Sequence, residues 1–113
     1  MNDYLGYLFA YRDAAHRMHL RTKSFAKHVA LGELYDFLSD KLDELAEVVQ
    51  GQQGIIDIPK KGDLPQTQDE QAFIAELCQV LKSERSDYPH IQNILDEITA
   101  FCFRIKYKID NLS

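Results

Sequence analysis

The sequence predicts an all-α protein, a four-helix bundle in which a long crossover joins the second helix to the third. Apolar residues recur at intervals of three and four in four separate segments, and no segment alternates like a strand. A stretch rich in glycine and proline divides the four segments into two pairs. With 113 residues, 45% of them hydrophobic, the chain is long enough for one domain, residues 1–113, with one core.

The first pair of helices is expected at about residues 3–21 and 24–50. Thr22 and Ser24 are candidates for the N-cap of the second helix, and Gly51 is expected to end it. The apolar positions with helical spacing are Leu5, Leu8, Tyr11, Ala15 and Met18 in the first helix, and Leu31, Tyr35, Leu38, Leu42, Leu45 and Val49 in the second.

The second pair is expected at about residues 67–84 and 89–111. Thr67 and Glu70 have the spacing of a capping box, and Pro89 is well placed in the first turn of the last helix. The apolar positions are Phe73, Leu77, Val80 and Leu81 in the third helix, and Ile91, Ile94, Leu95, Ile98, Phe101, Cys102, Ile105, Ile109 and Leu112 in the fourth.

The connections between the helices restrict the topology. Few residues separate the helices within each pair, so each pair should form an antiparallel hairpin. Residues 51–66 could span roughly 55 Å, more than the roughly 40 Å length of the second helix. They can therefore cross the full height of the bundle, which is the ferritin-like arrangement. An up-and-down bundle with a loose loop is the alternative.

Composition excludes several classes of function. The formal net charge is -5 and the pI about 5.2, and the 13 basic residues are scattered, so nucleic acid is not an expected partner. Cys78 and Cys102 lie in apolar helical patterns, as reduced core thiols do. No apolar run approaches the roughly 20 residues that cross a bilayer, and the N-terminus lacks a basic region. We expect a soluble, cytoplasmic protein that does not bind membranes.

The second helix carries a candidate subunit interface. Small residues recur every seven positions, at Gly32, Ser39 and Ala46. Such a run lets another helix approach closely, so we expect a homo-oligomer built on a two-fold dimer through this helix. The carboxylates at positions 36, 40, 43 and 47 lie nearby on the wheel. A solvated acidic face is the alternative interpretation.

Histidines and carboxylates then suggest a metal site. His16 and His19 lie near the end of the first helix and His28 near the start of the second, so a hairpin brings them together. Asp43 and Glu47 are spaced to hold one cation. His28 and Asp43 lie about 22 Å apart along one helix, so only a second, antiparallel copy could unite them, with a two-fold axis near residues 36–38. A purely structural histidine contact is the alternative.

These residues resemble the ferroxidase segment of Dps-like mini-ferritins, and most closely the short ferritin-like proteins of tailed bacteriophages. The resemblance rests on His19-Leu20, on the segment Thr22-Lys23-Ser24-Phe25-Ala26-Lys27-His28-Val29-Ala30-Leu31-Gly32-Glu33-Leu34-Tyr35-Asp36, on Asp43-Glu44-Leu45-Ala46-Glu47 and on Gln50-Gly51. It implies that His28, Asp43 and Glu47 bind iron across a subunit interface, with either His16 or His19 as the ligand from the first helix. Where mini-ferritins place another aspartate, this chain has Gly32.

Two functions remain open at this point. The resemblance implies an oligomer that binds iron, with manganese or zinc as alternatives, and that has ferroxidase-type activity. The alternative is a non-enzymatic protein with a vestigial site, either a virion component or an inhibitor of a host protein. If the protein is encoded by a phage, the expected location is the host cytoplasm or the virion.

Overall fold

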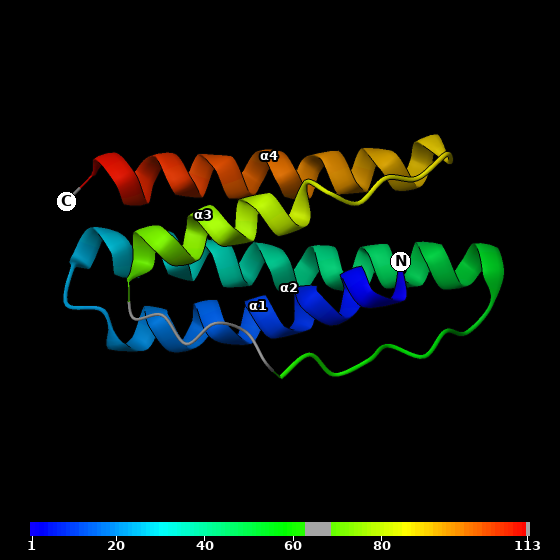
Figure 1. Ribbon diagram of the computed structural model, residues 1–113, viewed down its shortest axis with the longest axis horizontal. Helices are drawn as coiled ribbons and strands as arrows, with labels where there is room; N and C mark the ends of the chain where they lie inside the picture. Colours follow the sequence, from blue (N-terminus) through cyan, green and yellow to red (C-terminus); the bar gives the residue numbers. More distant parts are fainter. Residues whose placement is uncertain (63–68, 113) are drawn as a thin grey trace.

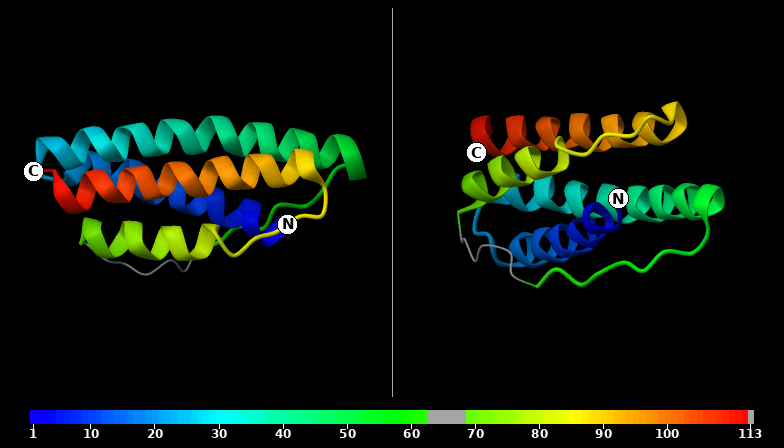
Figure 2. Two further views of the ribbon diagram at one scale, coloured as in Figure 1. Left: turned by 90° about the horizontal axis from the view of Figure 1, so that it is seen from above. Right: turned by 45° about the vertical axis from the view of Figure 1, so that its right-hand side comes forward.

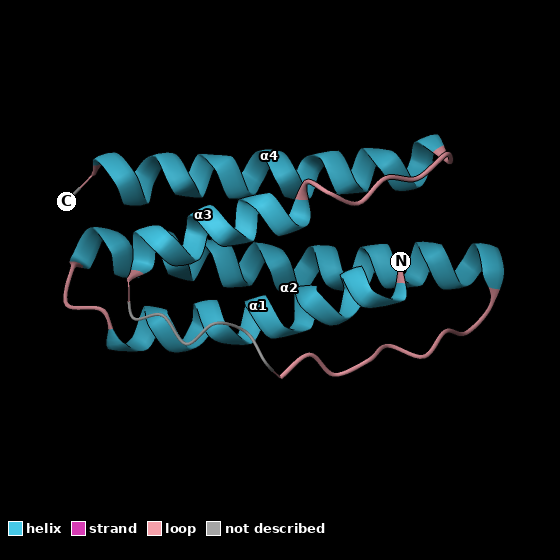
Figure 3. Ribbon diagram, in the orientation of Figure 1, coloured by secondary structure: helices cyan, strands magenta, loops and turns pink. Residues whose placement is uncertain are grey.

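The structure is a computed structural model that describes residues 1–62 and 69–112. It contains the helices α1 (Asn2–Arg21), α2 (Phe25–Gln53), α3 (Glu70–Leu81) and α4 (Pro89–Asn111), and the described residues include no strand (Figure 3). The prediction of an all-helical, four-helix chain is confirmed. No helix in these two ranges has both the length and the apolar character needed to span a bilayer.

The helices form two antiparallel hairpins, α1 with α2 and α3 with α4 (Figure 1). α2 packs against both α1 and α4, and α4 also packs against α3 (Figure 2). α2 and α3 begin at the same end of the bundle. Residues 54–62 accordingly leave the far end of α2 and return beside α1, where Lys61 forms an ion pair of 2.9 Å with Asp3. This segment therefore runs back along the bundle, in the direction expected of a crossover between α2 and α3.

The start of α2 follows the prediction, whereas its end does not. Ser24 is the N-cap, and its side chain accepts a hydrogen bond of 3.2 Å from the backbone amide of Lys27. The helix continues through Gly51 to Gln53, and its C-cap is Gly54, whose φ of 92° lies in the left-handed region that glycine adopts readily. The prediction that Gly51 ends the helix is wrong, because a glycine can remain in a helical conformation.

The second hairpin differs slightly from its predicted bounds. α3 begins at Glu70 rather than at residue 67, with the side chain of Asp69 accepting from the amide of Gln71. The predicted capping residue Thr67 lies outside the described residues. α3 ends at Leu81, shorter than expected, and α4 has its proline in the first turn as predicted.

The core is apolar throughout the described residues. All buried positions there carry hydrophobic side chains or glycine, drawn from all four helices, and Cys78 and Cys102 are buried free thiols among them. Outside the core, polar contacts join α2 to α4: Lys108 pairs with Glu33 at 2.8 Å, and Lys41 pairs with Glu97. These two ion pairs attach α2 to α4, whereas α1 contacts α2 at other positions, Gly32 and Ser39 among them.

Candidate metal centre

His19 and His28 form a reciprocal contact across the α1–α2 hairpin. The Nδ1 atom of His19 lies 2.6 Å from the backbone oxygen of His28, and Nδ1 of His28 lies 2.7 Å from the backbone oxygen of His19. The turn of three residues between the helices produces this arrangement, because it brings the last turn of α1 beside the first turn of α2. Both side chains are half-buried.

The two contacts determine which nitrogen of each ring carries the proton. A carbonyl oxygen can only accept a hydrogen bond, so Nδ1 must be the donor in both rings. The Nε2 atom of each neutral ring then keeps its lone pair, and neither Nε2 has a hydrogen-bond partner within residues 1–62 and 69–112. Histidines that bind metals are commonly held in this way, with the other ring N–H donated to a carbonyl.

The rings are stacked, which limits how they could hold a metal ion. Their centroids are 3.8 Å apart and their planes differ by 16°. A nitrogen lone pair lies in the plane of its ring, and the metal–nitrogen bond is roughly 2 Å long. Two nearly parallel rings cannot both direct their lone pairs at one ion. Each histidine therefore offers one nitrogen at a separate position, unless one ring rotates and gives up its hydrogen bond.

His16 does not join this pair. It is exposed and stacks on Tyr35 of α2, with ring centroids 4.0 Å apart, while its distance to the ring of His19 is 6.2 Å. The edge of Tyr35 in turn meets His19, with centroids 5.3 Å apart. Of the two α1 histidines left open by the sequence, the structure places His19 beside His28. The part taken by Tyr35 was not anticipated, because it matched the apolar pattern of α2.

Gly32 has a steric role in the structure. A Cβ atom at this position would lie 2.9 Å from Cε1 and 3.1 Å from Nδ1 of His19. Real Cβ atoms almost never approach other atoms so closely, so a glycine is what allows the His19 ring to lie against α2. A carboxylate at this position, as in the mini-ferritin pattern, would exclude the ring.

The run of small residues faces α1 of the same chain. Besides Gly32, Ser39 accepts a hydrogen bond of 3.3 Å from Nη1 of Arg12 in α1, and Ala46 is buried within the chain. α1 of the same chain thus occupies two of the three positions in this run, and whether the run also meets another subunit stays a prediction. The oligomeric state itself stays a prediction.

Asp43 and Glu47 lie on the exposed face of α2, together with Asp36 and Asp40. Asp43 lies about 22 Å from His28 along the helix axis, and Glu47 lies one turn further away. Within the described residues, no three histidine, cysteine, aspartate or glutamate side chains are grouped as they would be around a metal ion. One chain thus unites two of the five predicted ligands, and whether a second chain completes the set stays a prediction.

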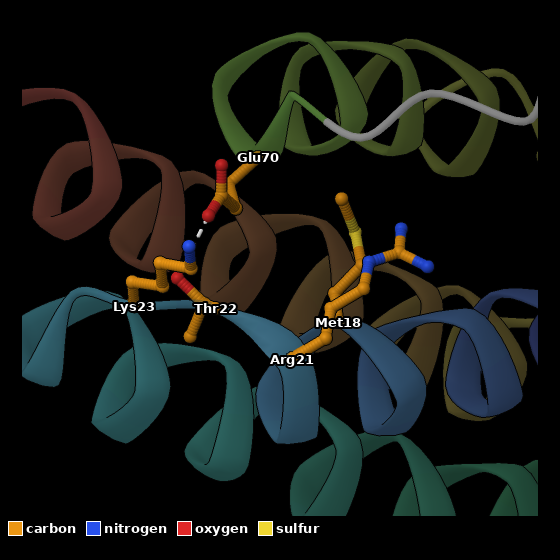
Figure 4. A pocket seen from close by; sticks show the side chains of 5 residues that line it. All are labelled: Met18, Arg21, Thr22, Lys23 and Glu70. Carbon is orange, nitrogen blue, oxygen red and sulfur yellow. Dashed lines mark hydrogen bonds between the residues drawn. The ribbon is translucent and has the colours of Figure 1, made fainter.

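A hydrogen bond tethers the histidine hairpin to α3. Thr22, in the α1–α2 turn, donates to Glu70 with an oxygen–oxygen distance of 2.7 Å (Figure 4). Burial favours the neutral form of Glu70, but this bond and a backbone hydrogen bond outweigh it, and the pKa of Glu70 is lowered. The turn that holds the histidines is therefore attached to the second hairpin.

Comparisons with known proteins identify the family. A family of unknown function (DUF5856) matches residues 19–109. The chain is also similar to the "Uncharacterized 14.6 kDa protein in mobD-ri intergenic region" of Enterobacteria phage T4, with 31% identity over 113 residues, 94% of this chain and 84% of the relative. Neither match is to a ferritin or Dps family, and no solved structure matches. The chain belongs to the family of unknown function DUF5856.

Proposed function

We propose that the protein is a phage-encoded, ferritin-like oligomer that binds a divalent metal ion, iron in the first place, between two copies of the chain. His28 of one copy supplies an imidazole nitrogen to the ion, His19 offers a second nitrogen at a separate position, and Asp43 and Glu47 of another copy supply carboxylates. The observation that carries the proposal is the reciprocal hydrogen bonding of the two histidines, which holds both Nε2 lone pairs ready for a ligand.

The donor set supports iron or manganese, with zinc as an alternative. Imidazole binds iron and zinc well, and carboxylates extend the set to harder cations such as manganese. The long crossover after α2 and the similarity to a phage protein are consistent with a phage-encoded bundle of the ferritin-like type that acts in the host cytoplasm. Oxidation of bound ferrous iron by dioxygen or peroxide is the activity to assay.

The test is thermal unfolding with ferrous or manganous ion, carried out anaerobically for iron. At a hundredfold excess over the dissociation constant, a ligand of the folded state stabilises it by about 2.7 kcal/mol, so the melting temperature should rise. The double variant His28→Ala with Glu47→Ala should lose this rise. His90→Ala is the matched control, because His90 is exposed at the start of α4 and lies outside the proposed site.

Two results would count against the metal site. Protein purified without chelator that carries no iron, manganese or zinc, and whose melting temperature no divalent ion changes, would reject it. An equal rise in the wild type and the double variant would place the bound metal elsewhere.

A second candidate function is the binding of a partner protein without catalysis. Large apolar side chains are exposed where α2 begins and α4 ends, with Phe25 72%, Val29 42% and Leu112 46% accessible. Phe25, Val29 and Leu112 line one groove there, and exposed apolar patches often mark interaction sites. Retention of a host protein by the wild type, and its loss in Phe25→Glu, would favour this candidate if metals have no effect.

A further inference from the structure

Arg12 has an incompletely satisfied guanidinium group beside the exposed face of α2. It projects from α1, and its one hydrogen bond within the described residues runs from Nη1 to the hydroxyl of Ser39, 3.3 Å away. Its Nε atom is buried and lacks a hydrogen-bond partner within the described residues. A guanidinium has five N–H donors, and in Arg12 the terminal Nη atoms, rather than the buried Nε, are the donors that a carboxylate from outside the chain would meet. No carboxylate of the described part of the chain pairs with it.

Asp36 and Asp40 lie within one turn of Ser39 on α2 and are exposed. Neither forms an ion pair or a hydrogen bond within the ranges that the structure describes. The contact with Ser39 places Arg12 at the same height along α2 as these two carboxylates. Asp36 lies about 4.5 Å from Ser39 along the helix axis.

A two-fold axis near residues 36–38 would bring the carboxylates of two copies together. In antiparallel α2 helices, position 36 of one copy then faces positions 36–40 of the other, so Asp36 and Asp40 from both copies meet near the axis. Carboxylates that approach one another repel unless a cation lies among them. On the α1 side of this face, Arg12 is the permanently charged cation at the same height.

We propose that Arg12 of each copy pairs with Asp36 of the other, so that two equivalent arginine–aspartate contacts flank the two-fold axis. The inference rests on the dimer in the proposed function and adds the contact that sets its register. The occupant of this face is a second copy, because the face presents both members of the charge pair and a self-complementary patch is what a two-fold interface requires.

The experiment uses reversed charges in the full-length protein, with the dimer dissociation constant measured by sedimentation. Arg12→Asp and Asp36→Arg should each raise this constant at least about tenfold, because each places like charges together. Mixing the two single variants should restore association, since each chain then meets the opposite charge in its partner. The doubly reversed chain should also associate with itself, which isolates the contact between positions 12 and 36.

Arg17→Asp is the matched control. Arg17 also lies on α1, but it is exposed and pairs with Asp13 at 2.8 Å, away from α2. Its reversal should leave the dissociation constant unchanged, and circular dichroism should show the same helix content in every variant. Partners other than a second copy, such as a small anion held by Arg12, would give no restoration on mixing.

The outcomes separate this inference from the proposed function. A wild type that stays monomeric at all concentrations rejects the proposed dimer and the arginine contact with it. A wild-type dimer whose association is unaffected by Arg12→Asp, or is not restored by mixing the two variants, rejects the contact alone and leaves the metal site standing.

Discussion

The role assigned to Gly32 predicts an unusual response to alanine. Within a helix, alanine is normally more favourable than glycine by about 1 kcal/mol. In this protein the added methyl group would lie 2.9 Å from Cε1 of His19, so the ring must move. The ring is held by its hydrogen bond to the backbone oxygen of His28, and it is stacked on the ring of His28, so it cannot move freely.

The expected magnitude follows from these contacts. Displacing the His19 ring should cost about 1 kcal/mol for its hydrogen bond to His28 and about 1 kcal/mol for its stacking on the His28 ring. After subtracting the gain of about 1 kcal/mol in helix propensity, Gly32→Ala should lower the free energy of unfolding by about 1 kcal/mol. In a His19→Ala background nothing opposes the methyl group, and the same change should raise it by about 1 kcal/mol.

The assay is a double-mutant cycle by chemical denaturation, with the difference between the two backgrounds, about 2 kcal/mol, as the coupling energy. Gly51→Ala is the matched control in the same helix, because a Cβ there would meet nothing within 4 Å. It should stabilise both backgrounds alike, by up to about 1 kcal/mol. If Gly32→Ala stabilises the wild type as much as the His19→Ala variant, the steric account of Gly32 is refuted.

Three further predictions follow from buried or hydrogen-bonded groups. The buried Tyr4 hydroxyl lacks a hydrogen-bond partner within the described residues, so Tyr4→Phe should leave the free energy of unfolding unchanged or raise it by up to about 1 kcal/mol. Tyr11→Phe loses a hydrogen bond of 3.0 Å to Glu76 and should lower the free energy of unfolding by about 1 kcal/mol. Equal losses for the two variants in denaturant titrations would contradict this. Burial raises the pKa of Cys78 to about 11, so a thiol reagent at pH 8 should label the native protein far more slowly than the unfolded chain. The pKa of Glu70 is lower in the folded protein than its ordinary value of 4.5, so the ionised carboxylate stabilises the fold at neutral pH. This contribution is lost as the pH falls below 4.5 and through the pKa of the folded state. Thr22→Val should therefore cost about 1 kcal/mol at pH 7 and progressively less in acid, and a loss independent of pH would argue against this hydrogen bond.

The sequence by itself determined the secondary structure and the core. Apolar spacing of three and four predicts four helices because each must bury one face, and that face is where the structure places its buried leucines and isoleucines. Ser24 and Pro89 marked two helix starts correctly, because capping and proline preferences act locally. The prediction that Gly51 ends the second helix was wrong, because a glycine permits a helix to end but does not require it.

The tertiary structure alone decided how the candidate site is arranged. A helical wheel shows which residues share a face, but which neighbouring helix covers that face depends on how the whole bundle packs. Gly32 and Ser39 therefore resembled a seam between subunits, although α1 of the same chain occupies both positions. The pairing of His28 with His19 rather than with His16 was likewise decided by the packing of the helices. The rings of His19 and His28 lie 3.8 Å apart because of how α1 is rotated against α2, and the spacing of residues within either helix does not determine that rotation.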